Sequence, residues 1–290
     1  MDQAEQLRNI MKRQSQQSKV ARVITVTSGK GGVGKSSISV NLAIQMSKLG
    51  KRVIILDADF GLANVEVMLG IRPKYNLADL LFRGKGIKDI ITEGPKGIGF
   101  ISGGSGIQEL NHISRNQIIE LTHKLDEIDS IADVIIIDTG AGINDMVLEF
   151  VVASSEILLV TTPEPTSITD AYALLKTLNR KPEFSATNST IKLIANRVES
   201  LTEGKELFNK LNVVVNQFLD IKIEYLGSIP QDNNVPKAII QQKPYSILYP
   251  NSQSTKAICN LSNILCEITK EEQKRRGISQ LFSSLIHSRR

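Results

Sequence analysis

Residues 25–43 read TVTSGKGGVGKSSISVNLA, and this stretch determines the fold. A β-branched run leads into a glycine-rich loop that ends in Gly34-Lys35-Ser36, and an amphipathic segment follows directly. A strand, a loop of the form Gly-x-x-x-x-Gly-Lys-Ser and a helix, in that order, are the context of a phosphate-binding loop. The glycines let backbone N–H groups point at phosphate oxygens, and the helix N-terminus adds partial positive charge. The stretch therefore predicts a nucleotide site.

Short apolar runs alternate with amphipathic segments along the rest of the chain. The runs are VITV, VIILDAD, IGFIS, DVIIID, ILLVTT, TIKLIAN and EYLGSIP. The amphipathic segments lie near residues 36–49, 115–129, 143–153, 166–180, 202–217 and 252–269. Runs that are apolar throughout are typical of parallel strands that helices cover on both faces. We therefore predict an α/β fold: one doubly wound, mostly parallel sheet with helices on both faces.

Composition narrows the class of protein. Of the 290 residues, 41% are apolar and 22% are charged, as in ordinary globular proteins. No run approaches the roughly 18 apolar residues of a membrane span, and the N-terminus lacks a secretory signal, so we expect a cytoplasmic protein. Cys259 and Cys266 lie seven residues apart in a helical pattern. This spacing favours two small buried side chains over a disulfide or a Cys-x-x-Cys metal site.

The net charge of +5 is concentrated in the two tails. Residues 1–22 carry +3 and residues 270–290 carry +4, which leaves −2 for residues 23–269. A slightly acidic body argues against a nucleic-acid-binding face, whereas basic tails suggest acidic partners.

The loop and the ends of two strands supply groups for phosphate chemistry. Lys35 is placed to neutralise the β- and γ-phosphates, and the Ser36 hydroxyl to bind Mg²⁺. Asp138 ends the run DVIIID, where a carboxylate suits a water-bridged contact with Mg²⁺, and Gly140 can bring a backbone N–H to the γ-phosphate. VIILDAD supplies two further carboxylates, of which Asp59 is better placed to orient an attacking water. The alternative is that Asp59 only caps the following segment.

Base recognition stays open at this point. Asn196-Arg197-Val198-Glu199 looks like a degenerate guanine motif, but Arg197 and Glu199 depart from the Asn-Lys-x-Asp pattern. Asn196 can equally bond the amino group and a ring nitrogen of adenine. Spacing alone favours ATP only modestly.

Together these segments resemble the MinD/ParA family of ATPases over about residues 20–270. The loop resembles the family's deviant Walker A motif, Asp57-Ala58-Asp59 its switch I, Asn196-Arg197 its adenine-reading Asn, and Ile229-Pro230-Gln231-Asp232 its nucleotide-side loop. The resemblance implies ATP and Mg²⁺ as cofactors and slow hydrolysis. It implies nucleotide binding by Gly31, Gly32, Val33, Gly34, Lys35, Ser36, Ser37, Asn196, Arg197, Pro230 and Asp232, metal binding by Ser36, Asp57 and Asp138, and catalysis by Lys30, Lys35 and Asp59.

The second lysine of the loop, Lys30, has a role of its own in that family. There the equivalent lysine reaches across a homodimer interface to the phosphates of the partner's ATP. Two facing loops bury much phosphate charge, and a cation donated by the other subunit makes dimerisation depend on ATP. The alternative for Lys30 is a solvated surface lysine.

The resemblance extends to the FlhG (YlxH/FleN) branch, whose members regulate flagellar number. Residues 2–8, DQAEQLR, resemble its N-terminal activator motif, and the segments LDADFGLAN and ISGGSG resemble the corresponding segments of that branch. The resemblance implies that Gln3 is the main residue, with Leu7 and Arg8, in stimulating the signal-recognition-type GTPase FlhF. It also implies flagellar basal-body (C-ring) proteins as partners. A helix as short as this N-terminal segment is only marginally stable in water, so the segment should become ordered only on a partner.

The C-terminus, KRRGISQLFSSLIHSRR, carries an apolar stripe between basic ends. The stripe consists of Ile278, Leu281, Phe282, Leu285 and Ile286. This pattern is typical of an interfacial helix on an anionic membrane surface. One copy should bind lipid weakly and reversibly, and two copies on a dimer more tightly through avidity. The alternative is a final helix that docks on the body with the same stripe.

These observations predict three parts: a flexible partner-activating segment (1–19), a MinD-like ATPase domain (20–270) and an amphipathic membrane-targeting helix (271–290). The leading hypothesis is an ATP-dependent dimerising switch that cycles between the cytoplasm and the inner face of the cell membrane and regulates flagellar number or placement. The alternative is a MinD/ParA-type positioning ATPase for another cargo, at the division site or in DNA partitioning. The acidic body argues against DNA, and the lack of Cys-x-x-Cys argues against an iron–sulfur carrier.

Overall fold

The computed structural model describes residues 20–59, 64–104, 123–184, 186, 189–267 and 277–287, except the side chains of residues 286 and 287. The predicted sheet is confirmed: eight strands lie in the order β3-β4-β2-β5-β1-β6-β7-β8, and only the β3–β4 pair is antiparallel. The strands are β1 (Arg22–Thr27), β2 (Val53–Ala58), β3 (Thr92–Glu93), β4 (Gly99–Ser102), β5 (Val134–Thr139), β6 (Glu156–Thr161), β7 (Thr190–Val198) and β8 (Ile223–Pro230).

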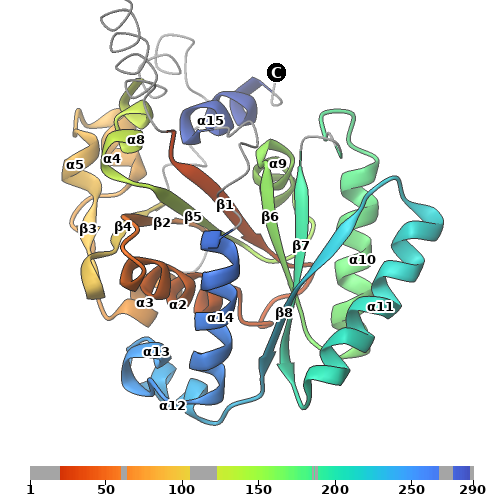
Figure 1. The fold of residues 1–290 in the computed structure, drawn as a ribbon. Helices are drawn as coiled ribbons and strands as arrows, with labels where there is room; N and C mark the ends of the chain where they lie inside the picture. The colour runs from red at the N-terminus through yellow and green to blue at the C-terminus, as the bar shows by residue number, and fades with distance from the viewer. Residues whose placement is uncertain are drawn as a thin grey trace, which may run out of the picture.

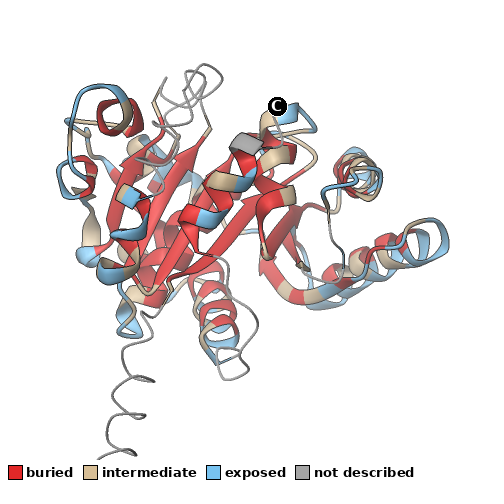
Figure 2. Ribbon diagram, turned by 90° about the horizontal axis from the view of Figure 1, so that it is seen from above, coloured by how far each residue is buried: buried red, intermediate tan, exposed pale blue. Residues whose placement is uncertain are grey.

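Helices cover both faces of this sheet, and Figure 2 shows the strands buried between them. The helices are α2 (Lys35–Lys48), α3 (Asn64–Leu69), α4 (Leu77–Phe82), α5 (Ile87–Ile90), α8 (Ile128–Ile131), α9 (Asp145–Ala153), α10 (Pro165–Asn179), α11 (Leu201–Phe218), α12 (Asn234–Ile240), α13 (Tyr245–Leu248), α14 (Gln253–Glu267) and α15 (Ile278–His287), with a 3-10 turn at Pro95–Gly97. One face packs against α2 and α14, and the other against α4, α5, α9 and α15 (Figure 1).

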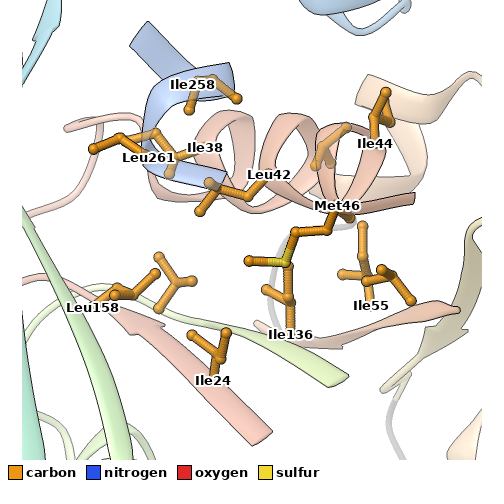
Figure 3. Close-up of a cluster of buried hydrophobic side chains, with 14 of the residues drawn as sticks. Ile24, Ile38, Leu42, Ile44, Met46, Ile55, Ile136, Leu158, Ile258 and Leu261 are labelled. Atoms are coloured by element: carbon orange, nitrogen blue, oxygen red, sulfur yellow. The ribbon is translucent and has the colours of Figure 1, made fainter. Parts of the chain in front are cut away.

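The strongest packing surrounds α2, the helix that follows the phosphate-binding loop. Ile38, Leu42 and Met46 project from it toward strands β1, β2 and β5, and all three are fully buried (Figure 3). Ile258 and Leu261 of α14 pack beside α2 in the same core cluster (Figure 3). Burying a side chain of this size contributes roughly 1.5–3 kcal/mol. The loop is therefore anchored by a rigid helix.

The strands and the long helices agree with the sequence prediction, whereas the region between β2 and β4 differs. The structure places three short helices, α3, α4 and α5, where no periodic pattern was evident. The predicted helix at 115–129 lies partly outside the described residues, and α8 follows at Ile128–Ile131. Gly50 ends α2, with φ of 81° and its N–H donating to the carbonyl of Ser47 at 2.9 Å.

The C-terminal helix α15 docks on the body. Ile278, Leu281, Phe282 and Leu285 of the predicted stripe are at most 3% exposed and belong to the core cluster beneath α4 and α9. The rings of Phe282 and Phe150 meet edge to face with centroids 6.0 Å apart. Of the two sequence-based interpretations, docking is therefore the arrangement that this structure contains, and a membrane role requires α15 to leave its groove.

Several predictions fall outside the described residues. These are the activator positions Gln3, Leu7 and Arg8 and the side chain of Ile286. Within the described ranges, no helix has both the length and the apolar character to cross a membrane.

Candidate nucleotide site

The phosphate-binding loop joins the end of β1 to the start of α2. Gly34 caps α2 in the left-handed region with φ of 101°, and no side chain caps the first turn of this helix. A Cβ at Gly34 would lie 2.5 Å from Nδ2 of Asn196, so only glycine fits there. The uncapped N–H groups and the helix dipole therefore form a preformed anion site.

A cavity of about 760 Å³ opens above this loop. Its walls contain most of the residues that the sequence singled out: Gly31, Gly32, Gly34, Lys35, Ser36, Ser37, Asp59, Asn196, Arg197, Pro230 and Asp232. Four predicted site residues do not line it, namely Lys30, Val33, Asp57 and Asp138. The cavity thus brings most of the predicted nucleotide-site residues together, with one layer of residues behind it.

Two buried carboxylates form part of that layer. Asp57 and Asp138 are register partners at the ends of the neighbouring strands β2 and β5, and they are 3% and 0% exposed. Burial, and then the charge of Asp138, raise the pKa of Asp57 to about 8. Burial also raises the pKa of Asp138 to about 6, although hydrogen bonds from Ser36 and Ser39 oppose this shift.

The carboxylate pair fits a divalent cation. Oδ1 of Asp138 accepts a hydrogen bond from the Ser39 hydroxyl at 2.8 Å, while its buried Oδ2 has no partner among the described residues. This site combines an unpartnered carboxylate oxygen, a second carboxylate and the hydroxyl-bearing residue Ser36. Hard oxygen donors of this kind suit Mg²⁺. Asp57, Asp138 and Ser36 are therefore the residues that would hold the ion, directly or through water.

Lys35 lies near the carboxylates of Asp138 and Asp59, and only 8% of its surface is exposed. Burial lowers its pKa, and the carboxylates of Asp138 and Asp59 oppose this change. A buried ammonium beside an anion site is suited to phosphate binding, and the role of Lys35 stays a prediction.

Asp59 lines the cavity and is fixed by its neighbours. Its backbone N–H donates to Oδ1 of Asp57 at 3.0 Å, and Nδ2 of Asn64 donates to its Oδ2 at 3.2 Å. A Cβ at Gly140 would lie 3.4 Å from Oδ1 of Asp59. Asn64 was missed by the sequence analysis, because a polar residue that begins a helix six positions after β2 gives no signal of its contact with Asp59.

Lys30 lies outside the cavity. Its Nζ donates to Oε2 of Glu164 and to Oγ1 of Thr166, both at 2.8 Å, at the start of α10. The side chain is 36% exposed. Lys30 is thus neither bound to its own nucleotide cavity nor an unpaired surface lysine.

Asn196 and Arg197 hold the loop from the end of β7. Nδ2 of Asn196 donates to the carbonyl of Val33 at 2.7 Å, and Nη2 of Arg197 donates to the carbonyl of Gly32 at 2.8 Å. The Asn196 oxygen has no partner in the described part of the chain and can still accept from an adenine amino group. The predicted role of Asn196 in reading adenine stays a prediction.

The nucleotide-side loop is tied to α14. The Asp232 carboxylate accepts hydrogen bonds from the backbone N–H of Asn234 at 2.9 Å and from the Ser254 hydroxyl at 2.8 Å. Asp232 therefore has a structural role in fixing the cavity wall, beside its predicted role in nucleotide binding.

The apolar part of the cavity wall was not predicted. It consists of Ile38, Met68, Ile229, Val235, Pro236, Ile239, Ile240 and Tyr245. Apart from Ile229 in the nucleotide-side loop and Ile38 just after the phosphate-binding loop, these residues come from segments without a motif. These residues come from several elements far apart in the chain, so only the folded structure brings them together.

Comparison with known proteins agrees with this geometry. The family model of ParA, described as NUBPL iron-transfer P-loop NTPase, matches residues 19–266. The antiactivator FleN of Pseudomonas aeruginosa is 44% identical over 236 residues, which cover 81% of this chain and 83% of FleN. The flagellum site-determining protein YlxH of Helicobacter pylori is 34% identical over 269 residues, which cover 91% of this chain and 90% of YlxH.

Solved structures show the same fold. The MinD chain of the MinC:MinD cell division protein complex from Aquifex aeolicus aligns with 89% of this chain and 100% of its own, at a TM-score of 0.65 and 25% identity. MinD of Pyrococcus horikoshii in complex with Mg-ADP covers 86% of this chain and 98% of its own at a TM-score of 0.66 and 22% identity. The chain therefore belongs to the ParA/MinD family of P-loop ATPases and, within it, to the FlhG (FleN/YlxH) family.

Proposed function

We propose that this protein is an ATP-dependent switch that dimerises, binds the membrane as the ATP dimer and regulates the number or placement of flagella. The observation that carries this proposal is the position of Lys30. A second loop lysine that lies outside its own nucleotide cavity, 36% exposed, has the reach and the access to serve a second subunit. Hydrolysis would limit the lifetime of the dimer.

The residues of the nucleotide site divide the tasks of ATP hydrolysis among them. The loop N–H groups and Lys35 would bind the phosphates of ATP, while Ser36, Asp57 and Asp138 would hold Mg²⁺. When bound, the ion would neutralise charge on the phosphate oxygens. Asp59, fixed by Asn64, is placed to orient a water for attack on the γ-phosphate.

Dimerisation would exchange the partners of Lys30. In the single chain the ammonium is neutralised by Glu164 at 2.8 Å, and the ion pair is exposed. Exposed pairs contribute little to stability, so the phosphates of a facing subunit can replace Glu164 at small cost. Binding of ATP, and not of ADP, would supply enough negative charge for the exchange.

Membrane binding would follow from the release of α15. The loop at 140–144 connects the metal-site strand β5 to α9, and the N–H of Gly142 donates to the carbonyl of Ser28 in the phosphate-binding loop at 3.0 Å. Phe150 of α9 in turn contacts Phe282 of α15. A shift of this loop on ATP binding would move α9 against α15 and weaken its docking.

The flagellar task rests on the relatives. FleN is named an antiactivator and YlxH a flagellum site-determining protein. We extend this task to the present chain and propose stimulation of an FlhF-type GTPase by Gln3, Leu7 and Arg8, with flagellar C-ring proteins as further partners. A positioning ATPase for another cargo is the alternative, supported by the likeness to MinD.

An iron–sulfur role, which the ParA family model's description suggests, has less support. Cys259 and Cys266 are the two cysteines of the chain, and both are half-buried on α14 and outside any disulfide. The Cys259 thiol donates to Oε1 of Gln45 at 3.1 Å, so it is engaged inside the fold. An iron assay on purified protein tests this alternative.

Sedimentation with anionic liposomes tests the switch. Full-length protein, a truncation after Lys270 and Lys30→Ala would be compared with ADP and with a slowly hydrolysed ATP analogue. We expect only the full-length protein to pellet, and only with the analogue. Protein that stays soluble in every state would overturn the membrane part of the proposal and leave the ATPase part intact.

A further inference from the structure

A short stretch of the acidic body is strongly basic. Residues 72–88, the basic segment, contain five Lys or Arg and one acid, for a net charge of +4. The remainder of residues 23–269 therefore carries −6, since the whole body carries −2. The one acid, Asp79, is 5% exposed and accepts hydrogen bonds from Arg83 at 2.8 Å and from the N–H of Asn76 at 2.9 Å. The exposed charge of this segment is therefore entirely positive.

Two of its lysines gather around one aromatic ring. Nζ of Lys85 lies 4.3 Å and Nζ of Lys74 lies 5.2 Å from the centroid of the Tyr75 ring. Hydrogen bonding to Lys85 and to Lys74 lowers the pKa of Tyr75. Neither ammonium forms an ion pair with a carboxylate of the described chain. Two like charges held side by side, neither of them in an ion pair among the described residues, favour an external anion.

The basic segment lies in the same layer as α15. Leu77 and Leu80 of α4 and Ile87 of α5 belong to the core cluster that contains the α15 stripe. Figure 1 shows α4, α5 and α15 along the upper edge of the molecule, while α12 and α13 lie at the lower edge. Phe82, at the end of α4, is 40% exposed. An exposed aromatic beside basic residues is the composition of a membrane-interface contact.

We propose that the basic segment is a second membrane-contact surface, which binds anionic lipid headgroups through Lys74 and Lys85 when α15 inserts. This inference rests on the membrane binding proposed above. A single weak amphipathic anchor binds reversibly, and a basic patch beside it supplies the second signal that stable attachment needs. A nucleic-acid groove is the less suitable match, because the cluster is compact and includes the apolar Phe82 instead of extending as a basic track.

Vesicle partitioning with two matched pairs of variants tests the assignment. Lys74→Gln/Lys85→Gln removes two charges from the basic segment, and Lys205→Gln/Lys210→Gln removes two exposed charges from α11. Both would be titrated with vesicles of phosphatidylcholine and phosphatidylglycerol in the presence of the ATP analogue. We expect the first pair to bind about 30-fold more weakly than wild type and the control pair to bind like wild type. Lys74→Arg/Lys85→Arg should restore binding, and higher salt should weaken wild type more than the Gln pair.

The outcomes separate this inference from the proposed function. If the Gln pair binds vesicles as the control does, while truncation after Lys270 abolishes binding, the basic segment is not a lipid contact and the switch stands. If wild type does not bind vesicles at all, the membrane part of the proposed function fails first. If the Gln pair loses affinity for short duplex DNA and keeps its affinity for vesicles, the surface binds nucleic acid, and the lipid assignment is overturned.

Discussion

The nucleotide site and the α15 groove are held together by different physical interactions. Polar groups fix the nucleotide site: Asp57 and Asp138 are buried side by side, and the Ser39 hydroxyl orients Asp138 at 2.8 Å. Apolar side chains fix α15, with the Phe150–Phe282 ring pair at their centre. A polar site recognises one ligand, because each group needs its own partner. An apolar stripe needs no specific partner, so the release of α15 to a membrane proposed above would leave the stripe buried in lipid.

The largest effect on activity is expected from a change in the nucleotide site. Lys35→Ala should lower the ATPase rate about a hundred- to a thousandfold, because the cation beside the phosphates is lost in a buried site. Steady-state phosphate release measures it. Lys48→Ala, an exposed lysine at the other end of α2, is the matched control and should leave the rate unchanged. A Lys35→Ala protein with near-normal turnover would show that the predicted site is not the catalytic one.

The α15 groove is tested by a substitution in α9, on the body of the protein. Phe150→Ala removes the ring that contacts Phe282 and leaves the apolar stripe of α15 intact. Truncating a buried Phe costs about 3–5 kcal/mol, part of which falls on the docking of α15. We expect this variant to sediment with anionic vesicles even with ADP. The second change Phe282→Ala should reverse that gain, and strict dependence on ATP in Phe150→Ala would argue against docking as the control point.

A pH change tests the buried carboxylates of the nucleotide site. Because the folded pKa of Asp57 is about 8, the folded state holds a proton between roughly pH 4 and 8 that the unfolded chain has released. The free energy of unfolding should therefore fall as pH rises through this window, and Mg²⁺ should bind better at its upper end, where it competes with fewer protons. Thermal unfolding with and without Mg²⁺ and an ATP analogue measures both effects. In Asp57→Asn the dependence on pH should shrink; an unchanged dependence would assign it to other groups.

The smallest effect is expected at Glu164. Glu164→Gln removes the single-chain partner of Lys30 in an exposed pair, so stability should not change measurably. The dimer should form at slightly lower protein concentration with the ATP analogue, because Lys30 then has no carboxylate to leave and gives up only neutral partners such as Thr166. Light scattering on a concentration series resolves this difference. Weaker dimerisation would mean that Glu164 itself contributes to the interface.

The polar site was predictable from sequence to a large degree, because motifs place its residues at strand ends. The loop from Gly31 to Ser37 and the carboxylates Asp57 and Asp138 follow from parallel strands whose carboxyl ends meet at one edge of the sheet. Asn64 and the apolar wall at α12 were missed, because their contacts are long-range and carry no local pattern.

For the α15 stripe, the sequence predicted the helix but not what covers its apolar face. Its periodicity from Ile278 to Leu285 predicted a helix with one apolar face, and the structure contains that helix. Whether the face meets lipid or protein depends on the presence of a matching groove, which is formed by α4, α8, α9 and the sheet. Amphipathicity alone reports that a face is buried and not what covers it.

The central claim is that nucleotide state controls the docking of α15, and a distance measurement tests it most directly. Nitroxide labels would be attached at Gln280 on α15 and Lys205 on α11, both exposed, in a Cys259→Ser/Cys266→Ser background. Double electron–electron resonance would measure the distance between the two labels in samples diluted with unlabelled protein. We predict one narrow distance with ADP, and a broad, longer distribution with the ATP analogue and anionic vesicles. With Lys30→Ala the distance should stay narrow in both conditions. A narrow, unchanged distance in wild type, in samples that dimerise with the analogue, would contradict the account.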